Sequence, residues 1–168
     1  RLMQARPYAE KTAELLKMVA ALSPHHPLLE RPTEARKGEF LILTSDRGLC
    51  GGFNGNLLRR IEDFLKNPEL SYQEVGIHVI GKKGRDFFKS RRRELASVET
   101  GVYESFGFEK ALKIARDFAT GFAEKKFDHL YIVYNQFKSA ISQEIRIDRI
   151  LPVEPKAIEG HLPEYLYE

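Results

Sequence analysis

The chain has 168 residues, of which 42% are hydrophobic and 30% are charged. This size suits one globular domain with an added arm, and such a chain buries roughly 70% of its unfolded surface. A net charge of +3 is too balanced to indicate nucleic-acid binding by itself. The single cysteine, Cys50, excludes an internal disulfide and a zinc cluster made of thiolates.

Targeting segments are not evident in the sequence. No apolar run approaches the roughly 18 residues that cross a bilayer, and no signal-peptide pattern is present. We therefore predict no membrane insertion. Because the chain opens at Arg1 rather than at a start methionine, we expect it to be part of a longer protein.

The first residues predict a helical arm. A stripe of apolar residues runs from Tyr8 to Leu22 at helical spacing. Pro7 either occupies the first turn of this helix or kinks a helix that began upstream. The helix is expected to end near Ser23, because a residue before proline avoids helical backbone angles. Three prolines in residues 23–37 indicate a linker to the body of the protein.

The body alternates strand and helix patterns. Short apolar runs predict buried strands at 40–44, 75–80 and 130–134, and a weaker edge strand at 95–98. Helical patterns lie between them, at 53–65, at 82–92 and after Gly107. This alternation predicts an α/β fold with a mainly parallel sheet.

The last connection predicts a hairpin instead of a crossover. The stretch from Gln136 to Ser142 is too short for a crossover helix, and residues 144–151 alternate apolar with charged side chains. We therefore expect an antiparallel edge strand at that place.

In total we predict an arm and linker over 1–37, the α/β domain over 38–155, and an irregular tail over 156–168.

A glycine-rich loop follows the first strand, with glycines at 48, 51, 52 and 55. Nucleotide-binding folds hold phosphate at this position, because free backbone amides point outward there. The spacing gives neither G-x-G-x-x-G nor a Walker A loop, and no acidic residue ends the second strand. Two interpretations stay open: a turn that needs glycine for close packing, and a freestanding nucleotide- or anion-binding module that uses loop 48–55.

Other candidate chemistry is sparse. A helix N-terminus would lower the pKa of the Cys50 thiol and favour a nucleophile, but a small packing residue is the simpler interpretation. The five histidines show no metal-ligand spacing, and His78 is predicted to be a core or face residue of its strand.

The stretch 82–93 is strongly basic. It could bind nucleic acid or acidic protein loops, although a solvated helix face is the more common meaning of such a run. Phe87 and Phe88 fit a core stripe, so the aromatic interleaving of single-strand binders is missing. The candidate interface residues are Lys82, Lys83, Arg85, Arg91, Arg92 and Arg93.

Residues 44–54, with the sequence TSDRGLCGGFN, closely resemble the signature of the ATP synthase gamma subunit family. Residues 6–10 (RPYAE), 134–140 (YNQFKSA) and 165–168 (YLYE) resemble further segments of that family, in the same order. The GGFN ending, and the lack of a second cysteine, resemble the bacterial type.

The resemblance implies a fold and a role. The fold would be a Rossmann-like, three-layer α/β domain without a nucleotide site, placed between two long helices of an antiparallel coiled coil. This chain would hold the end of the first helix and stop before the second. The role would be that of a central-stalk rotor, which couples rotation of the c ring to conformational change in the catalytic hexamer and is not itself catalytic.

The resemblance also implies partners and a location. The partners would be the alpha and beta subunits, the epsilon subunit and the c ring, with no cofactor and no nucleic acid. The protein would lie peripherally at the cytoplasmic face of the bacterial inner membrane.

The resemblance places one loop near the base of the catalytic hexamer. The residues concerned are Asp46, Arg47, Gly48, Leu49, Cys50, Gly51 and Gly52. Arg47 is a candidate contact for an acidic loop of the beta subunits, whereas a local salt bridge or helix cap is the plainer interpretation. The basic stretch 82–93 is a second candidate interface.

Overall fold

A computed structural model describes residues 2–22, 25–48, 52–68, 70–101, 107–139 and 142–155. The chain divides into two compact units, one of residues 1–31 with 152–168 and the other of residues 32–151. The predicted boundaries after residues 37 and 155 stay predictions.

The smaller unit contains helix α1 (Leu2–Leu22) and a short 3₁₀ helix, η1 (Pro27–Leu29). Pro7 lies inside α1, so the helix begins upstream of the proline. The backbone amide of Leu28 donates to Nδ1 of His26 over 3.2 Å, which caps η1. The amide of Val153 donates to the carbonyl of Leu28 over 2.8 Å and ties the end of the described chain to η1.

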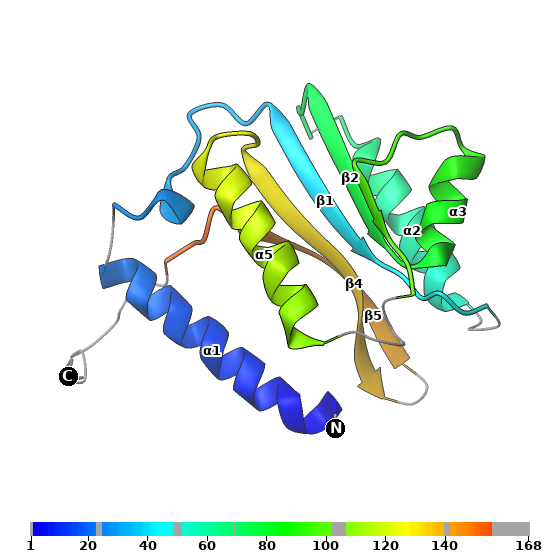
Figure 1. Cartoon of the computed structure of the whole chain (residues 1–168), viewed down its shortest axis with the longest axis horizontal. Coiled ribbons are helices and arrows are strands. Elements are labelled where there is room, and N and C mark those ends of the chain that lie inside the picture. Colours follow the sequence, from blue (N-terminus) through cyan, green and yellow to red (C-terminus); the bar gives the residue numbers. More distant parts are fainter. Residues whose placement is uncertain are drawn as a thin grey trace. The chain divides into compact units, whose positions relative to one another are not determined.

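The larger unit is an α/β domain built on a single five-stranded sheet (Figure 1). Its elements are β1 (Lys37–Leu43), α2 (Gly52–Leu65), β2 (Glu74–Ile80), α3 (Lys82–Ser90), β3 (Ser97–Glu99), α5 (Phe108–Ala123), β4 (His129–Ser139) and β5 (Ser142–Leu151). The strand order is β3-β2-β1-β4-β5, parallel throughout except for the antiparallel pair β4–β5. The predicted α/β class, with its mainly parallel sheet and antiparallel edge strand, is confirmed.

Helices cover both faces of the sheet, with α2 and α3 on one side and α5 on the other (Figure 1). Side chains of a strand alternate between faces, and β1 therefore supplies both cores. Phe40 and Ile42 pack with α2 and α3, whereas Leu41 packs with α5 through Ile114 and Phe118. This explains why residues 40–43 of β1 form a continuous apolar run.

An aromatic cluster fills the core at the amino ends of β1 and β4. Phe40 is fully buried and stacks on Tyr131 with ring centroids 4.8 Å apart. The rings of Phe64 and Tyr72 meet Phe40 edge-on. The hydroxyl of Tyr72 lies 2.5 Å from Nδ1 of His129, and burial lowers the pKa of this imidazole, so its neutral form is favoured.

The last two strands are longer than predicted. Residues 136–139 were expected in the connection, but they continue β4, and Phe137 pairs with Gln143 in the ladder. A long two-stranded ribbon can satisfy its own backbone hydrogen bonds beyond the end of the neighbouring strand. The edge strand β3 covers 97–99 instead of 95–98.

Removing the Phe40 side chain tests the importance of the aromatic cluster. We expect Phe40→Ala to lower the free energy of unfolding by about 3–5 kcal/mol, because a fully buried ring leaves a cavity. The matched control is Phe108→Ala at the start of α5, where the side chain is 80% exposed. The control should cost less than about 0.5 kcal/mol in chemical denaturation, and equal losses in the two variants would contradict the packing account.

Candidate partner-contact site

The predicted contact loop leaves the carboxyl end of β1. Thr44–Gly48 is described and Gly52 opens α2, whereas Leu49, Cys50 and Gly51 lie outside the described residues. The interpretation of Cys50 as a nucleophile or a packing residue therefore stays a prediction.

Asp46 ties three loops of the domain together. Its Oδ1 accepts a hydrogen bond from the backbone amide of Lys82 over 2.9 Å, at the first residue of α3. Its Oδ2 accepts from the amide of Gly101 over 3.0 Å, just beyond β3. One carboxylate thus joins the segments that follow β1, β2 and β3.

The N-terminus of α3 is satisfied entirely by its own chain. A helix leaves its first four amides without partners inside the helix. Here the amide of Gly81 donates to the Glu99 carbonyl over 2.8 Å, and that of Lys82 donates to Asp46. The next amides, of Lys83 and Gly84, donate to the Ser45 carbonyl over 3.1 Å and to Thr44 Oγ1 over 2.9 Å. A phosphate at this helix would have to displace these bonds.

Two glycines allow the close approach of α3 to the β1 loop. Gly81 has a φ of +105°, which side chains rarely adopt, and a Cβ there would lie 2.2 Å from the Thr44 carbonyl oxygen. A Cβ on Gly84 would lie 2.6 Å from Val79 Cγ1 and 2.9 Å from Thr44 Oγ1. Thr44 is buried, and its hydroxyl also donates to the Ile80 carbonyl. A side chain at either glycine could therefore not be accommodated by moving Thr44 away.

Asn54, in the first turn of α2, fixes the other end of the loop. Its Oδ1 accepts from the Ser45 amide over 2.9 Å, and its Nδ2 donates to Ser45 Oγ over 2.8 Å. The ribbon of β4 and β5 joins the same region, because Asn135 Nδ2 donates to the Phe53 carbonyl over 3.0 Å. Ser45 and Asn54, from the segment 44–54 that resembles the gamma subunit signature, thus hydrogen-bond to each other within the protein.

Positive charge gathers where this loop meets α3. Arg47 is exposed, and the Lys83 ammonium lies 3.3 Å from the position that a Cβ on Gly48 would take. The Lys82 side chain is exposed beside it. We call Arg47, Lys82 and Lys83 the cationic corner.

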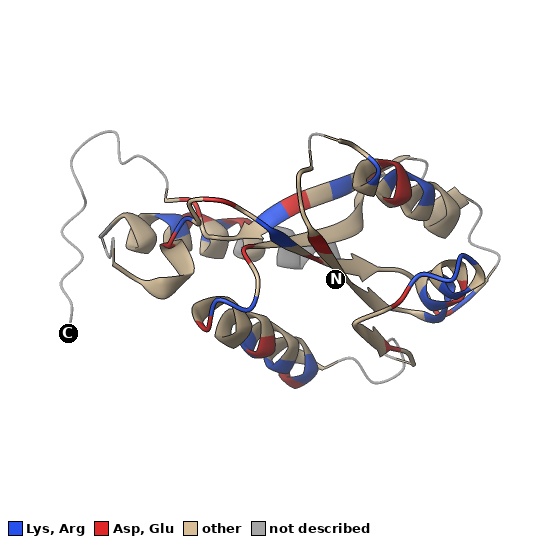
Figure 2. Cartoon of the chain, turned by 90° about the horizontal axis from the view of Figure 1, so that it is seen from above, with Lys and Arg blue, Asp and Glu red and all other residues tan. Residues whose placement is uncertain are grey.

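Some basic side chains of the predicted stretch 82–93 form ion pairs, and others do not. Arg85 pairs with Asp86 over 2.8 Å, and Arg91 pairs with Glu62 over 3.3 Å while covering the Phe87 ring. Within the described part of the chain, no ion pair holds Lys82, Lys83, Arg92 or Arg93. Figure 2 shows the concentration of basic residues at α3.

Sequence reasoning missed the residues that build this end of the domain. Thr44, Asn54 and Asn135 lie in the segments that resemble the family, but nothing in the sequence indicated which groups their side chains would bond. The spacing of Gly81 and Gly84 was the available signal for close helix packing. His78, predicted to be a core or face residue, forms a half-buried hydrogen-bonded pair with Glu39, which had not been considered.

Comparison with known proteins places the chain. A sequence model described as "ATP synthase" matches residues 1–168. The chain belongs to this ATP synthase family. It is 38% identical over 174 residues to the ATP synthase gamma chain of Anaeromyxobacter sp. Fw109-5, covering 99% of this chain and 60% of the relative. It is 40% identical over 168 residues to the gamma chain of Brevibacillus brevis, covering 98% of this chain and 58% of the relative.

The chain therefore spans about 60% of the length of these gamma chains. Among solved structures, it resembles a chain in the central stalk and c-ring structure of the Tetrahymena thermophila mitochondrial ATP synthase. The TM-score is 0.63 at 25% identity, over 89% of this chain and 67% of that one. A chain in the Euglena gracilis mitochondrial ATP synthase rotor shares the fold, with a TM-score of 0.56 at 19% identity, over 98% of this chain and 68% of that one.

The described residues contain neither a membrane-spanning helix nor a metal site. No helix among them is long and apolar enough to cross a membrane. No group of three or more histidine, cysteine or acidic side chains among them could hold a metal ion.

Removing the Asp46 carboxylate tests the account of the loop. We expect Asp46→Ala to lower the free energy of unfolding by about 1–3 kcal/mol, because the amides of Lys82 and Gly101 lose their acceptor. Asp63→Ala is the control, since that side chain is exposed on α2, and it should change stability by less than about 0.5 kcal/mol. Chemical denaturation of both variants measures the difference. If Asp46→Ala leaves the free energy of unfolding unchanged, the proposed role of the Asp46 hydrogen bonds in stability is refuted.

Proposed function

We propose that this chain is the α/β part of the central-stalk rotor subunit of a proton-translocating ATP synthase. In this role it couples rotation of the c ring to conformational change in the catalytic hexamer. The observation that carries the proposal is the family match over residues 1–168, together with gamma chains that align to 98–99% of the chain.

We propose further that the chain is not itself catalytic. The geometry supports this, because the N-terminal amides of α3 are used by the loop that follows β1. Helix N-termini commonly bind phosphate, and the bonded amides of α3 are not available for this. The loop before α2, where doubly wound folds bind the phosphate, lies partly outside the described residues. A body whose polar groups are occupied internally suits a stiff mechanical part.

The proposed partners are the alpha and beta subunits, the epsilon subunit and the c ring. The protein would be peripheral, at the cytoplasmic face of the bacterial inner membrane, which agrees with the bacterial origin of the relatives. Leu15, Leu16 and Val19 of α1 are each about half exposed. These apolar side chains would pack against a second helix in the complete subunit.

The cationic corner is the proposed contact with an acidic loop of the beta subunits. Arg47 lies next to Gly48, where an added Cβ would lie 3.3 Å from the Lys83 ammonium. Asp46 links this loop to the backbone amide of Lys82. Electrostatic contacts of this kind favour fast, reversible association, which a rotating shaft requires. Arg92 and Arg93 extend the basic surface beyond α3.

Charge reversal in the complete subunit tests this contact. In an enzyme reconstituted with its other subunits, we expect Arg47→Glu combined with Lys82→Glu to reduce ATP-driven proton pumping about tenfold, because like charges then face each other. Reversing the acidic loop of the beta subunit should restore part of the activity. The control is Arg116→Glu, because Arg116 is exposed on α5. The enzyme with this substitution should pump protons normally.

Loss of pumping in the control, or full pumping in the double variant, would refute the contact.

The alternative of a freestanding nucleotide- or anion-binding module is tested separately by thermal unfolding. Under that alternative, millimolar ATP or phosphate raises the melting temperature of the chain, whereas the rotor proposal expects no shift.

A further inference from the structure

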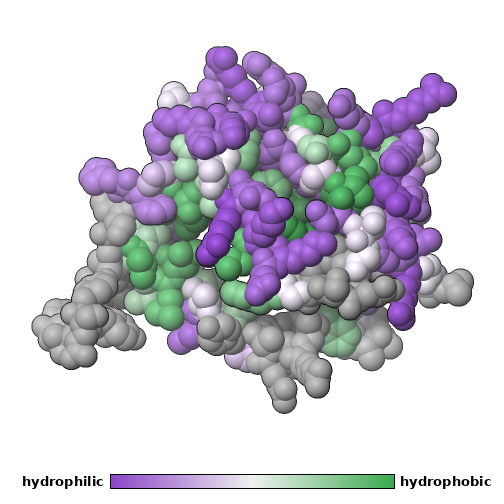
Figure 3. Space-filling view, viewed as in Figure 1, coloured by the Kyte–Doolittle hydropathy of each residue, from purple (hydrophilic) through white to green (hydrophobic). Residues whose placement is uncertain are grey.

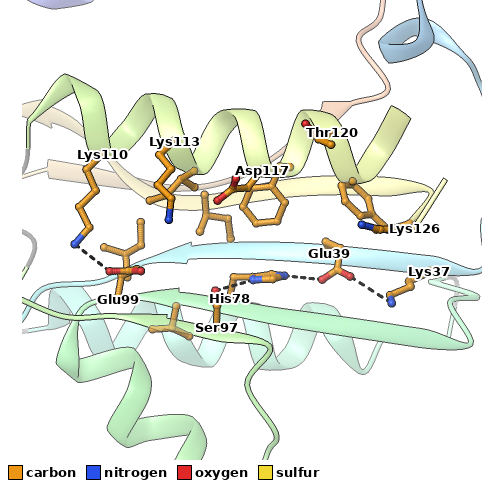
Figure 4. A pocket seen from close by; sticks show the side chains of 17 residues that line it. Lys37, Glu39, His78, Ser97, Glu99, Lys110, Lys113, Asp117, Thr120 and Lys126 are labelled. Atoms are coloured by element: carbon orange, nitrogen blue, oxygen red, sulfur yellow. Dashed lines mark hydrogen bonds and ion pairs between the residues drawn. The ribbon is translucent and has the colours of Figure 1, made fainter. Parts of the chain in front are cut away.

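The face of the sheet that carries α5 is hollowed beside that helix. A pocket of about 660 Å³ lies between α5 and strands β1, β2 and β3 (Figure 4). Its volume falls within the range of roughly 300–1,000 Å³ that is typical of small-molecule sites. Hydrophobic surface is visible between hydrophilic side chains on this face (Figure 3).

Apolar side chains form one wall of the pocket. Ile114 and Phe118 of α5 pack against Leu41 and Ile80 of the sheet, and Phe127 closes one end. A ligand with apolar groups would be stabilised here by removing them from water.

The floor of the pocket is polar and internally hydrogen-bonded. Nε2 of His78 lies 2.8 Å from Oε2 of Glu39, and Nδ1 lies 2.8 Å from Oγ of Ser97. The Glu39 side chain is only 9% exposed. A Cβ on Gly76 would lie 1.7 Å from Glu39 Oε2, so glycine at this position makes room for the carboxylate. Burying charge and hydrogen-bonding groups in a sheet face costs stability, which is typical of sites that serve a function.

The charges around the pocket are mostly paired. The Lys37 ammonium lies 3.7 Å from Oε1 of Glu39. The Lys110 ammonium lies 2.9 Å from Oε2 of Glu99, and that of Lys126 lies 2.6 Å from Oε2 of Glu124. Two charged residues of the lining, Lys113 and Asp117, have no hydrogen bond or ion pair with any described residue. Both side chains extend from α5 toward the pocket (Figure 4). They are one helical turn apart, in the order lysine then aspartate, which is the weaker orientation for a pair within a helix.

We propose that this pocket binds a short zwitterionic peptide with apolar side chains, of about the size of a dipeptide. Lys113 would bind the terminal carboxylate of the ligand and Asp117 its terminal ammonium, while the side chains contact Ile114 and Phe118. A helical turn separates the two Cβ atoms by about 5–6 Å, and two extended residues span about 7 Å. A ligand with only one charge would meet an uncompensated charge of its own sign.

The proposal does not depend on the proposed rotor function, because it concerns a ligand of the isolated domain. The test is calorimetric titration of the chain with the dipeptide Leu-Phe, with N-acetyl-Leu-Phe and with Leu-Phe amide. We expect Leu-Phe to bind, and each blocked peptide to bind about tenfold more weakly, which corresponds to about 1.4 kcal/mol. Lys113→Met and Asp117→Asn should each weaken Leu-Phe binding by a similar factor.

Arg116→Met is the matched control. Arg116 is an exposed cation of the same helix that does not line the pocket, so this variant should bind like the parent chain. Circular dichroism establishes that all three variants are folded. The proposal is overturned if Leu-Phe does not bind at millimolar concentration, if the blocked peptides bind equally well, or if Arg116→Met loses as much affinity as Lys113→Met.

Discussion

The structure depends on the way in which the loop after β1 satisfies the first turn of α3. Four amides of that helix need partners, and the loop supplies three of them through Asp46, Ser45 and Thr44. This arrangement joins two parallel strands and a helix into one rigid corner. It also uses helix N-terminal amides that could otherwise bind an anion. Arg47 directly follows Asp46, whose carboxylate bonds the first residue of α3.

Much of the fold was predictable because strands and helices have different hydrophobic periods. The run at 40–44 is apolar on both faces, and helices do cover both faces of β1. The alternation in 144–151 correctly predicted the antiparallel edge strand. The length of the β4–β5 ribbon was not predictable, because three of the four residues 136–139 carry polar side chains and their ladder depends on pairing with β5. Local patterns report burial, and this part of the ribbon is half-buried or exposed.

The candidate site shows a similar division. The sequence identified the segment around Asp46 and Arg47 through its family resemblance. It did not reveal that Asp46 serves the chain itself, since its partners are the amides of Lys82 and Gly101, which lie far along the chain. The same holds for the pocket on the other face, where Glu39, His78 and Ser97 come from three strands. Contacts between distant segments become visible only when the strand order is known. The domain thus presents two different surfaces, a cationic corner at the ends of the strands and a pocket beside α5.

The central claim is that this domain belongs to a rotor stalk. The most direct measurement is co-elution of the purified chain with the epsilon subunit of the same enzyme on a sizing column at moderate salt. The account predicts a stable one-to-one complex. Separate elution of the two proteins, with the chain shown to be folded by circular dichroism, would contradict the claim that this domain carries a docking surface of the central stalk.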